Sequence, residues 1–291
     1  MEEKEHPNYP DIHYLRERAK RRIPRFAFEY LDGGCNTESN LRRNTEDIRN
    51  VLLKPVYIRK IQKPSLETTL FGKTYDVPFG ICPIGLQGLV WPRATEILAQ
   101  AAFDHNLPFI LSTVATASIE TVAEITEGNA WFQLYHPVED ELRDKLLERC
   151  EAAGIKTLVI LSDVPAFGYR SKEIINGLAI PPKMTLRNFL QITSRPQWAL
   201  KTLLAGQPEF KTLKPYIPAG MSLRHLGLFM NQTFSGVLDD DKIKAIRDKW
   251  KGNLVLKGVA SREDTQKAVD LGLEGVIFSN HGGRQLDPGE S

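Results

Sequence analysis

The chain has 291 residues, of which 42% are hydrophobic and 25% are charged, and its formal net charge is +2. This length allows one large α/β domain with a sizeable core, and the charge balance argues against a nucleic-acid surface. The three cysteines are odd in number and lack metal-ligand spacing, which argues against a disulfide framework and favours a reducing cytoplasm. Nothing in the sequence reads as a signal peptide or as a run that spans a bilayer.

The first part of the chain predicts an arm and a plug. Basic and apolar residues alternate from Asp11 to Leu31, which predicts two short helices broken near Pro24. Further on, Leu70-Phe71-Gly72-Lys73 predicts the turn of a small hairpin that closes the amino end of a barrel.

Strands and helices then alternate along the rest of the chain. Parallel strands need crossovers that helices can supply, so this alternation predicts a parallel sheet. Residues 171–241 have no clean period and are predicted to be an insertion, a lid or a membrane-contact segment, within a single domain that covers residues 1–291. The predicted strands are 78–85, 108–113, 131–135, 157–163, 254–258 and 275–278, and the predicted helices are 94–105, one opened by Ser118, 140–153, 241–251 and 262–271.

Six strands are two fewer than an eight-stranded α/β barrel contains. We therefore expect a TIM (β/α)8 barrel whose last two β/α units are missing from the written sequence. A six-stranded remnant would expose two parallel edges. The natural protein is accordingly expected to continue after Ser291.

The stretch from Ser279 to Asp287 is the most informative one. It follows the apolar strand 275–278, so its side chains fall at the carboxyl end of a strand, where such barrels carry their active sites. His281 is suited to accept a proton near neutral pH, and the guanidinium of Arg284 matches a carboxylate. Together they suit a hydroxy acid, and the alternative is a tight turn with solvated His and Arg.

Ser279-Asn280-His281-Gly282-Gly283-Arg284-Gln285 resembles the signature of the FMN-dependent 2-hydroxy acid dehydrogenase and oxidase family, and residues 23–34 resemble its N-terminal segment. The resemblance covers nearly the whole chain. It implies FMN as cofactor, a small 2-hydroxy acid as substrate and a homo-oligomer, namely a tetramer. The family's later units, whose glycine-rich turns hold the FMN phosphate, have no counterpart in the written residues.

The resemblance also implies roles for single residues. Lys257 lies on an apolar strand, and a buried Lys needs a partner. The resemblance implies that this partner is the flavin. Taken alone, Asp163 could equally be a turn cap. The implied catalytic residues are His281, Asp163, Tyr135 and Lys257; the substrate-binding residues are Tyr30, Arg170, Arg284 and Tyr135; the cofactor-binding residues are Pro83, Ile84, Gly85, Ser112, Gln133, Lys257 and Ser279.

Four positions differ among members of this family. Ile84 and Leu161 stand where members commonly carry hydroxyls, and each lost hydrogen bond would weaken flavin binding by about 1 kcal/mol. At the position of Gly85, several dehydrogenases of the family also have Gly, whereas many oxidases have Ala. Val114 is smaller than the Trp of glycolate oxidases. These residues favour a dehydrogenase with a lactate-sized or aromatic substrate.

The insertion is relevant to the identity of the electron acceptor. Its apolar segments 198–200 and 226–230, with Lys201 nearby, suit a membrane surface, and the alternative is a mobile lid. The function expected is oxidation of an L-2-hydroxy acid to the 2-oxo acid, with electrons passed to a quinone or other carrier, in the cytoplasm or peripherally on the inner face of the membrane. The alternatives are an oxidase that forms hydrogen peroxide and a flavin-free truncated barrel that acts as a binding or scaffold protein.

Overall fold

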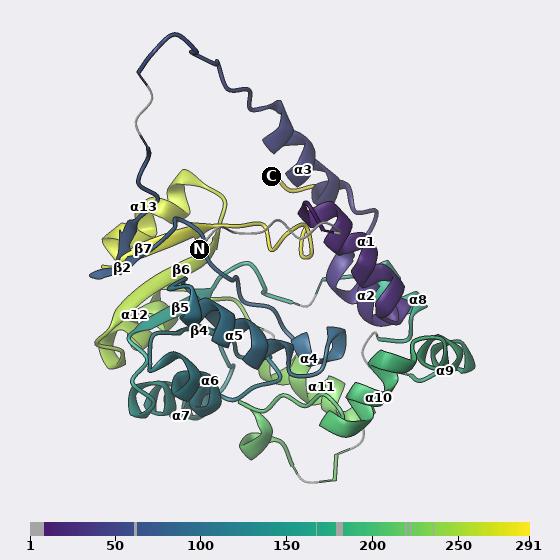
Figure 1. Ribbon diagram of the computed structural model, residues 1–291. Coiled ribbons are helices and arrows are strands. Elements are labelled where there is room, and N and C mark those ends of the chain that lie inside the picture. Colours follow the sequence, from purple (N-terminus) through teal and green to yellow (C-terminus); the bar gives the residue numbers. More distant parts are fainter. Residues whose placement is uncertain are drawn as a thin grey trace.

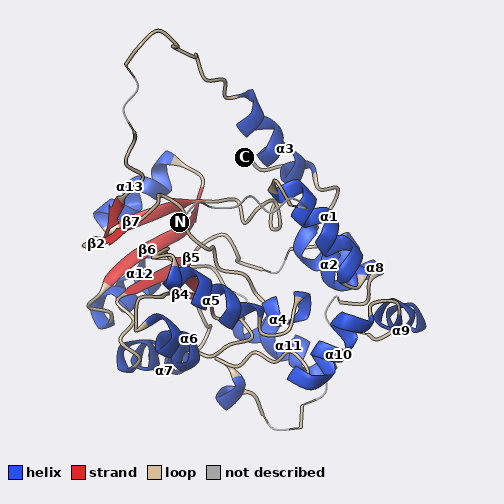
Figure 2. Ribbon diagram, in the orientation of Figure 1, coloured by secondary structure: helices blue, strands red, loops and turns tan. Residues whose placement is uncertain are grey.

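A computed structural model describes residues 9–60, 63–166, 168–178, 183–218, 220–221, 223–234 and 236–291. Its centre is a five-stranded sheet in the order β3, β4, β5, β6, β7, in which each strand is parallel to its neighbours (Figure 2). Strands that follow one another in the sequence therefore lie side by side. The strands are β3 (Ile110–Ser112), β4 (Trp131–Leu134), β5 (Thr157–Leu161), β6 (Asn253–Val259) and β7 (Gly275–Phe278).

Helices cover the outer face of this sheet (Figure 1). Their apolar sides form the main core with the outward residues of the strands, for example Leu146 and Ile246 against Phe132 and Leu158. The Ser118 hydroxyl accepts a hydrogen bond from the backbone N–H of Thr121, as its position before a helix predicts. The helices are α5 (Ala94–Asp104), α6 (Ile119–Thr126), α7 (Asp140–Ala152), α12 (Asp240–Lys249) and α13 (Arg262–Asp270).

The strand predicted at residues 78–85 is wrong in extent. The structure reduces it to one bridge between Ile81 and Phe109, parallel to the sheet. Pro78 and Pro83 lack the backbone N–H that a longer ladder would need. The five strands and this bridge together make six strand positions, in the order expected.

The predicted hairpin is present and closes the amino end of the sheet. It consists of β1 (Thr68–Leu70) and β2 (Lys73–Tyr75), and Phe71 at its tip packs with the inward side chains of the strands. The rings of Phe71 and Trp131 lie 5.3 Å apart, and Trp131 Nε1 donates to the Tyr75 hydroxyl at 3.3 Å. The floor of the barrel is therefore filled by side chains.

The N-terminal arm contains the two predicted helices, α1 (Ile12–Arg22) and α2 (Arg25–Asp32), with the break near Pro24 confirmed. A third helix, α3 (Ser39–Asn50), was not predicted. After α3, residues 51–60 run in a wide arc outside the body of the molecule (Figure 1). Leu53 and Ile58 in this arc are 90% and 100% exposed.

The insertion is helical rather than irregular. Its helices are short and separated by Pro and Gly, which hides their period from sequence inspection. Trp198 fixes it to the body, because its ring packs edge-on against Phe26 at 5.8 Å and its Nε1 donates to Val90 O at 3.1 Å. Trp198 packs at α4 (Gln87–Val90) of the body. The elements of the insertion are α8 (Ser171–Ile175), α9 (Leu186–Thr193), α10 (Pro196–Ala205), η1 (Lys214–Tyr216) and α11 (Leu223–Phe234).

Candidate active site

His281 and Asp163 meet at the carboxyl end of the sheet. His281 Nδ1 lies 3.0 Å from Asp163 Oδ1, and both side chains are largely buried, at 16% and 11% exposed. Burial lowers the pKa of His281, while the hydrogen bond to Asp163 acts in the opposite direction. The imidazole is therefore neutral at pH 7 and able to accept a proton.

Lys257 lies on the other side of the same carboxylate. Its Nζ is 3.8 Å from Asp163 Oδ2, which is too long for a hydrogen bond, and Oδ2 has no hydrogen-bond partner in the described part of the chain. Lys257 is only 8% exposed, and burial lowers its pKa although Asp163 opposes this effect. A buried ammonium with so loose a partner suits a ligand that gains negative charge.

Gly258 explains how Lys257 and Asp163 come so close, and inspection of the sequence missed it. The residue has a φ of +99°, at a register shift between Lys257 and Val259. A Cβ built on it would lie 2.6 Å from Asp163 Cβ. Only glycine allows β6 to bend here and to approach Asp163 at this distance.

Replacing Gly258 with alanine is expected to destabilise the fold by roughly 2–4 kcal/mol, because it combines backbone strain with overpacking. Gly272→Ala is the matched control, since Gly272 also has a positive φ, +72°, but no heavy atom within 4 Å of its ideal Cβ. Urea unfolding of both variants measures the difference. Equal losses of stability would show that the contact with Asp163 is unimportant.

The residues expected at the substrate carboxylate also converge. Tyr30 interacts electrostatically with both Arg170 and Arg284, and Tyr135 interacts with Tyr30 and Arg170, so the four side chains share one space. Burial raises the pKa of Tyr30 to about 12, and its hydroxyl donates to Gly85 O at 3.1 Å. Both phenols therefore remain hydrogen-bond donors at neutral pH.

The two arginines have different partners within the chain. Arg170 Nη1 donates to Glu173 Oε1 at 2.7 Å, and Arg284 Nη1 donates to Gly282 O at 2.8 Å. Arg284 Nη2 also donates to Leu31 O. Glu173 was not singled out from the sequence, although it lies in the first turn of α8, three residues after Arg170, which caps that helix.

The residues expected to hold FMN fit a flavin in their chemistry. Ser112 and Gln133 lie at the carboxyl ends of β3 and β4, and both are 2% exposed. The Ser112 hydroxyl accepts from Val114 N at 3.3 Å. Residues 83–85, with Pro83 and Ile84 half-buried, form the adjoining segment, and Ser279 lies after β7, where its hydroxyl accepts from His281 N at 3.0 Å. With the loosely paired Lys257, this set offers buried donors and acceptors at one mouth.

Tyr135 has a neighbour that the sequence did not reveal. The ring of Phe234, at the end of α11, meets it edge-on with centroids 6.2 Å apart. Val138 N donates to Thr233 O at 2.8 Å, so the segment after β4 is fastened to the end of α11. The last helix of the insertion therefore supports one wall of the site.

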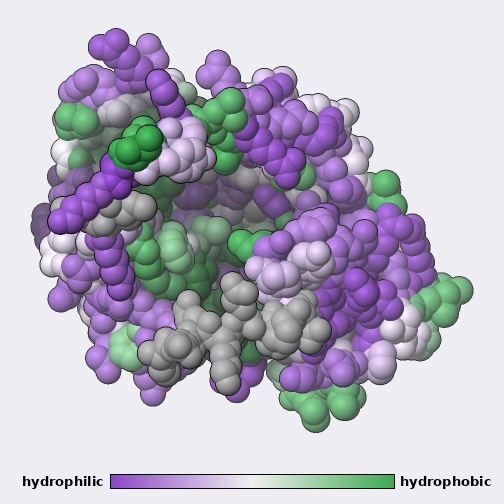
Figure 3. Space-filling view, turned by 45° about the horizontal axis from the view of Figure 1, so that its top comes forward, coloured by the Kyte–Doolittle hydropathy of each residue, from purple (hydrophilic) through white to green (hydrophobic). Residues whose placement is uncertain are grey.

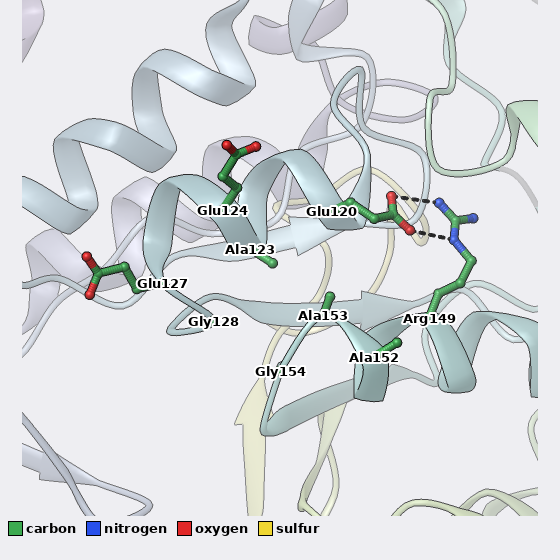
Figure 4. A pocket seen from close by; sticks show the side chains of 9 residues that line it. All are labelled: Glu120, Ala123, Glu124, Glu127, Gly128, Arg149, Ala152, Ala153 and Gly154. Carbon is green, nitrogen blue, oxygen red and sulfur yellow. Dashed lines mark hydrogen bonds and ion pairs between the residues drawn. The ribbon is translucent and has the colours of Figure 1, made fainter.

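A separate hollow lies between α6 and α7 (Figure 4). It has a volume of about 480 Å³, and Glu120 is paired with Arg149 at its edge. Gly128 and Gly154, which line it, precede β4 and β5. This hollow is thus at the amino ends of the strands, opposite His281, and is not the active-site mouth.

Comparisons with known proteins define the class. Residues 19–291 match the FMN-dependent dehydrogenases. An L-lactate dehydrogenase of Pseudomonas syringae pv. syringae (strain B728a) is 36% identical over 273 residues, which are 94% of this chain and 72% of that protein. The structure of (S)-mandelate dehydrogenase, a monotopic membrane protein, has a TM-score of 0.91 at 31% identity and covers 98% of this chain and 75% of that one. The structure of a mandelate oxidase has a TM-score of 0.75 at 28% identity, and the match covers 97% of this chain and 71% of the oxidase chain.

The chain belongs to the FMN-dependent dehydrogenase family. The family inferred from the signature and the α/β barrel inferred from the alternation of strands and helices are thereby confirmed, and FMN is the cofactor. The protein is an FMN-dependent oxidoreductase that acts on 2-hydroxy acids.

Proposed function

We propose that the enzyme oxidises an L-2-hydroxy acid of the lactate or mandelate type to the 2-oxo acid and passes the electrons to a quinone or another carrier. The observation that carries this proposal is the buried pair of His281 and Asp163, 3.0 Å apart, with Lys257 beside the same carboxylate. Oxidation of a hydroxy acid releases two protons and two electrons, and a proton acceptor with a carboxylate behind it is suited to taking one of the two protons.

Each of these side chains has a definite task in the proposed reaction. Asp163 engages His281 Nδ1, which leaves Nε2 as the nitrogen that takes the substrate proton, and the carboxylate then stabilises the imidazolium. Arg170 and Arg284, together with the Tyr30 hydroxyl, bind the substrate carboxylate. FMN, which Lys257, Ser112 and Gln133 would hold, would supply the acceptor for the two electrons and the second proton.

The surroundings of Gly85 favour a dehydrogenase. A Cβ on Gly85 would lie 2.8 Å from Val114 Cγ2 and 3.2 Å from the Tyr30 hydroxyl oxygen, so these side chains pack against Gly85 and an alanine there would force Val114 to shift. Val114 itself is small, which leaves room for an aromatic substrate. The similar proteins named above include dehydrogenases for L-lactate and (S)-mandelate.

The proposal is tested by the spectrum of the flavin. Addition of L-lactate or L-mandelate to the purified holoenzyme without oxygen should bleach the flavin, and a quinone analogue should restore the colour. No bleaching across a panel of 2-hydroxy acids would contradict the proposed function. Oxygen consumption during turnover would instead support the oxidase that forms hydrogen peroxide.

We also propose that the insertion contacts a membrane surface. No helix within the described ranges is long and apolar enough to cross a bilayer. On α9 and α10, however, Phe189 is 60%, Leu203 79% and Leu204 78% exposed, and Lys201 lies on the same helix as the two leucines. Apolar surface is visible at the right side of Figure 3, where these helices lie in Figure 1. Apolar groups flanked by basic ones suit shallow burial beside anionic lipids.

The double variant Leu203→Glu/Leu204→Glu is expected to lose sedimentation with anionic phospholipid vesicles, because each carboxylate would have to enter the acyl boundary. Flavin reduction in solution should be unchanged. Ile97→Glu, on the distant helix α5, is the control, since Ile97 is 54% exposed as well. Equal vesicle binding by both variants would rule out contact through α10.

A further inference from the structure

We propose that Asn40, Asn44 and Asn280, here called the asparagine cluster, position His281 for proton transfer. The inference rests on the proposed role of His281 as the base. Asn280 directly precedes His281, whereas Asn40 and Asn44 belong to α3 of the N-terminal arm, about 240 residues earlier in the chain (Figure 1). Asn40 and Asn44 act through Asn280 and are therefore positioning residues rather than catalytic ones.

The backbone that carries His281 is strained. His281 has a φ of 58°, and it is followed by Gly282 at 64° and Gly283 at 69°. The left-handed region is unfavourable for a residue with a Cβ. Such a conformation persists only where surrounding contacts determine it, so the loop needs an external support.

The asparagine cluster supplies this support through the side-chain amide of Asn280, whose nitrogen and oxygen both form hydrogen bonds. Asn280 Nδ2 has three acceptors within hydrogen-bond distance, Asn44 Oδ1 at 2.6 Å, Asn40 Oδ1 at 2.8 Å and Glu290 O at 3.0 Å. Asn280 Oδ1 accepts from Asn44 Nδ2 at 3.0 Å and from the backbone N–H of Gly283 at 3.1 Å. The amide thus spans the left-handed turn from one side of His281 to the other and joins it to α3.

Two further contacts hold α3 in place against this loop. The Asp287 carboxylate accepts from the backbone N–H groups of Ser39, at 2.7 Å, and Thr37, at 3.0 Å, at the start of α3. Gly283 packs so closely that an added Cβ would lie 2.5 Å from Leu41 N. Asn40 is completely buried. The arm and the loop therefore form one unit, and the orientation of His281 toward Asp163 depends on it.

The test compares Asn44→Ala with Asn50→Ala, a matched control on an exposed position at the end of the same helix. Asn44→Ala is expected to lower kcat for flavin reduction by on the order of 10-fold to 100-fold, with little change in KM, because the base is displaced while the carboxylate site is kept. The low-field proton resonance of the hydrogen bond between His281 Nδ1 and Asp163 should weaken as well. Asn50→Ala should change neither.

Asn44→Asp keeps the acceptor for Asn280 Nδ2 and is expected to recover part of kcat and of the resonance, which also keeps the test decisive if the alanine variant folds poorly. Wild-type kcat and an unchanged resonance in Asn44→Ala would overturn the inference. The variant His281→Gln separates this result from a failure of the proposed function. If His281→Gln itself reduced flavin at the wild-type rate, the role of His281 would be wrong rather than the role of the asparagine cluster.

Discussion

Replacing His281 with glutamine is expected to slow flavin reduction by the hydroxy acid by on the order of 10²-fold to 10⁴-fold, the usual contribution of a positioned base. Glutamine can still donate a hydrogen bond to Asp163, but its amide does not accept a proton at neutral pH. Burial lowers the pKa of His281, so the wild-type imidazole is already in the required neutral form at pH 7. Anaerobic stopped-flow absorbance of the flavin measures the rate.

His105→Gln is the matched control for this experiment, because His105 is an exposed residue at the end of α5. It should reduce flavin at the wild-type rate. A rate for His281→Gln within a few-fold of the wild type would show that another group takes the proton. An unchanged flavin spectrum in the resting variant would confirm that the cofactor is still bound.

The second large effect is expected for Asp163→Asn. This change removes the negative charge that faces His281 at 3.0 Å and Lys257 at 3.8 Å, so the imidazolium formed in the reaction loses its stabilisation. We expect kcat/KM to fall by at least about 10²-fold, within the range for a positioned acid–base group. Steady-state rates with the best substrate of the panel measure it.

The same variant makes a signed prediction for pH dependence. Burial lowers the pKa of His281 and Asp163 partly offsets this, so loss of the carboxylate lowers the pKa further. The acid limb of kcat/KM, which reports protonation of the free base, should therefore move to lower pH. Asp241→Asn, at a side chain that is 95% exposed, should leave the limb unmoved. A shift to higher pH in Asp163→Asn would contradict the assignment.

Much of the barrel could be predicted because its signals are local. The apolar run of β7 was located at residues 275–278, and the capping Ser118 located α6. The position of His281 after a strand end predicted that it lies at the mouth, whereas Asp163 was expected beside it only through the family resemblance; the structure brings the two side chains together.

The support of the site could not be predicted in this way. Asn40 and Asn44 meet Asn280 across 240 and 236 residues, and polar side chains on a short helix give no sign of so distant a partner. Gly258 could be recognised only once its closeness to Asp163 was known. The helices of the insertion were missed because Pro and Gly interrupt the segment and its apolar residues show no clean period, although Trp198 and Phe234 are both buried.

The hairpin formed by β1 and β2 has a kinetic consequence. Phe71 and Trp131 pack together at the amino end of the barrel, so substrate and product do not pass through that end. Hydroxy acid, product and electron acceptor are therefore expected to enter and leave at the carboxyl end, where His281 lies. If they share that entrance, the oxo acid leaves before the acceptor binds, and the expected result is a ping-pong scheme with parallel double-reciprocal lines.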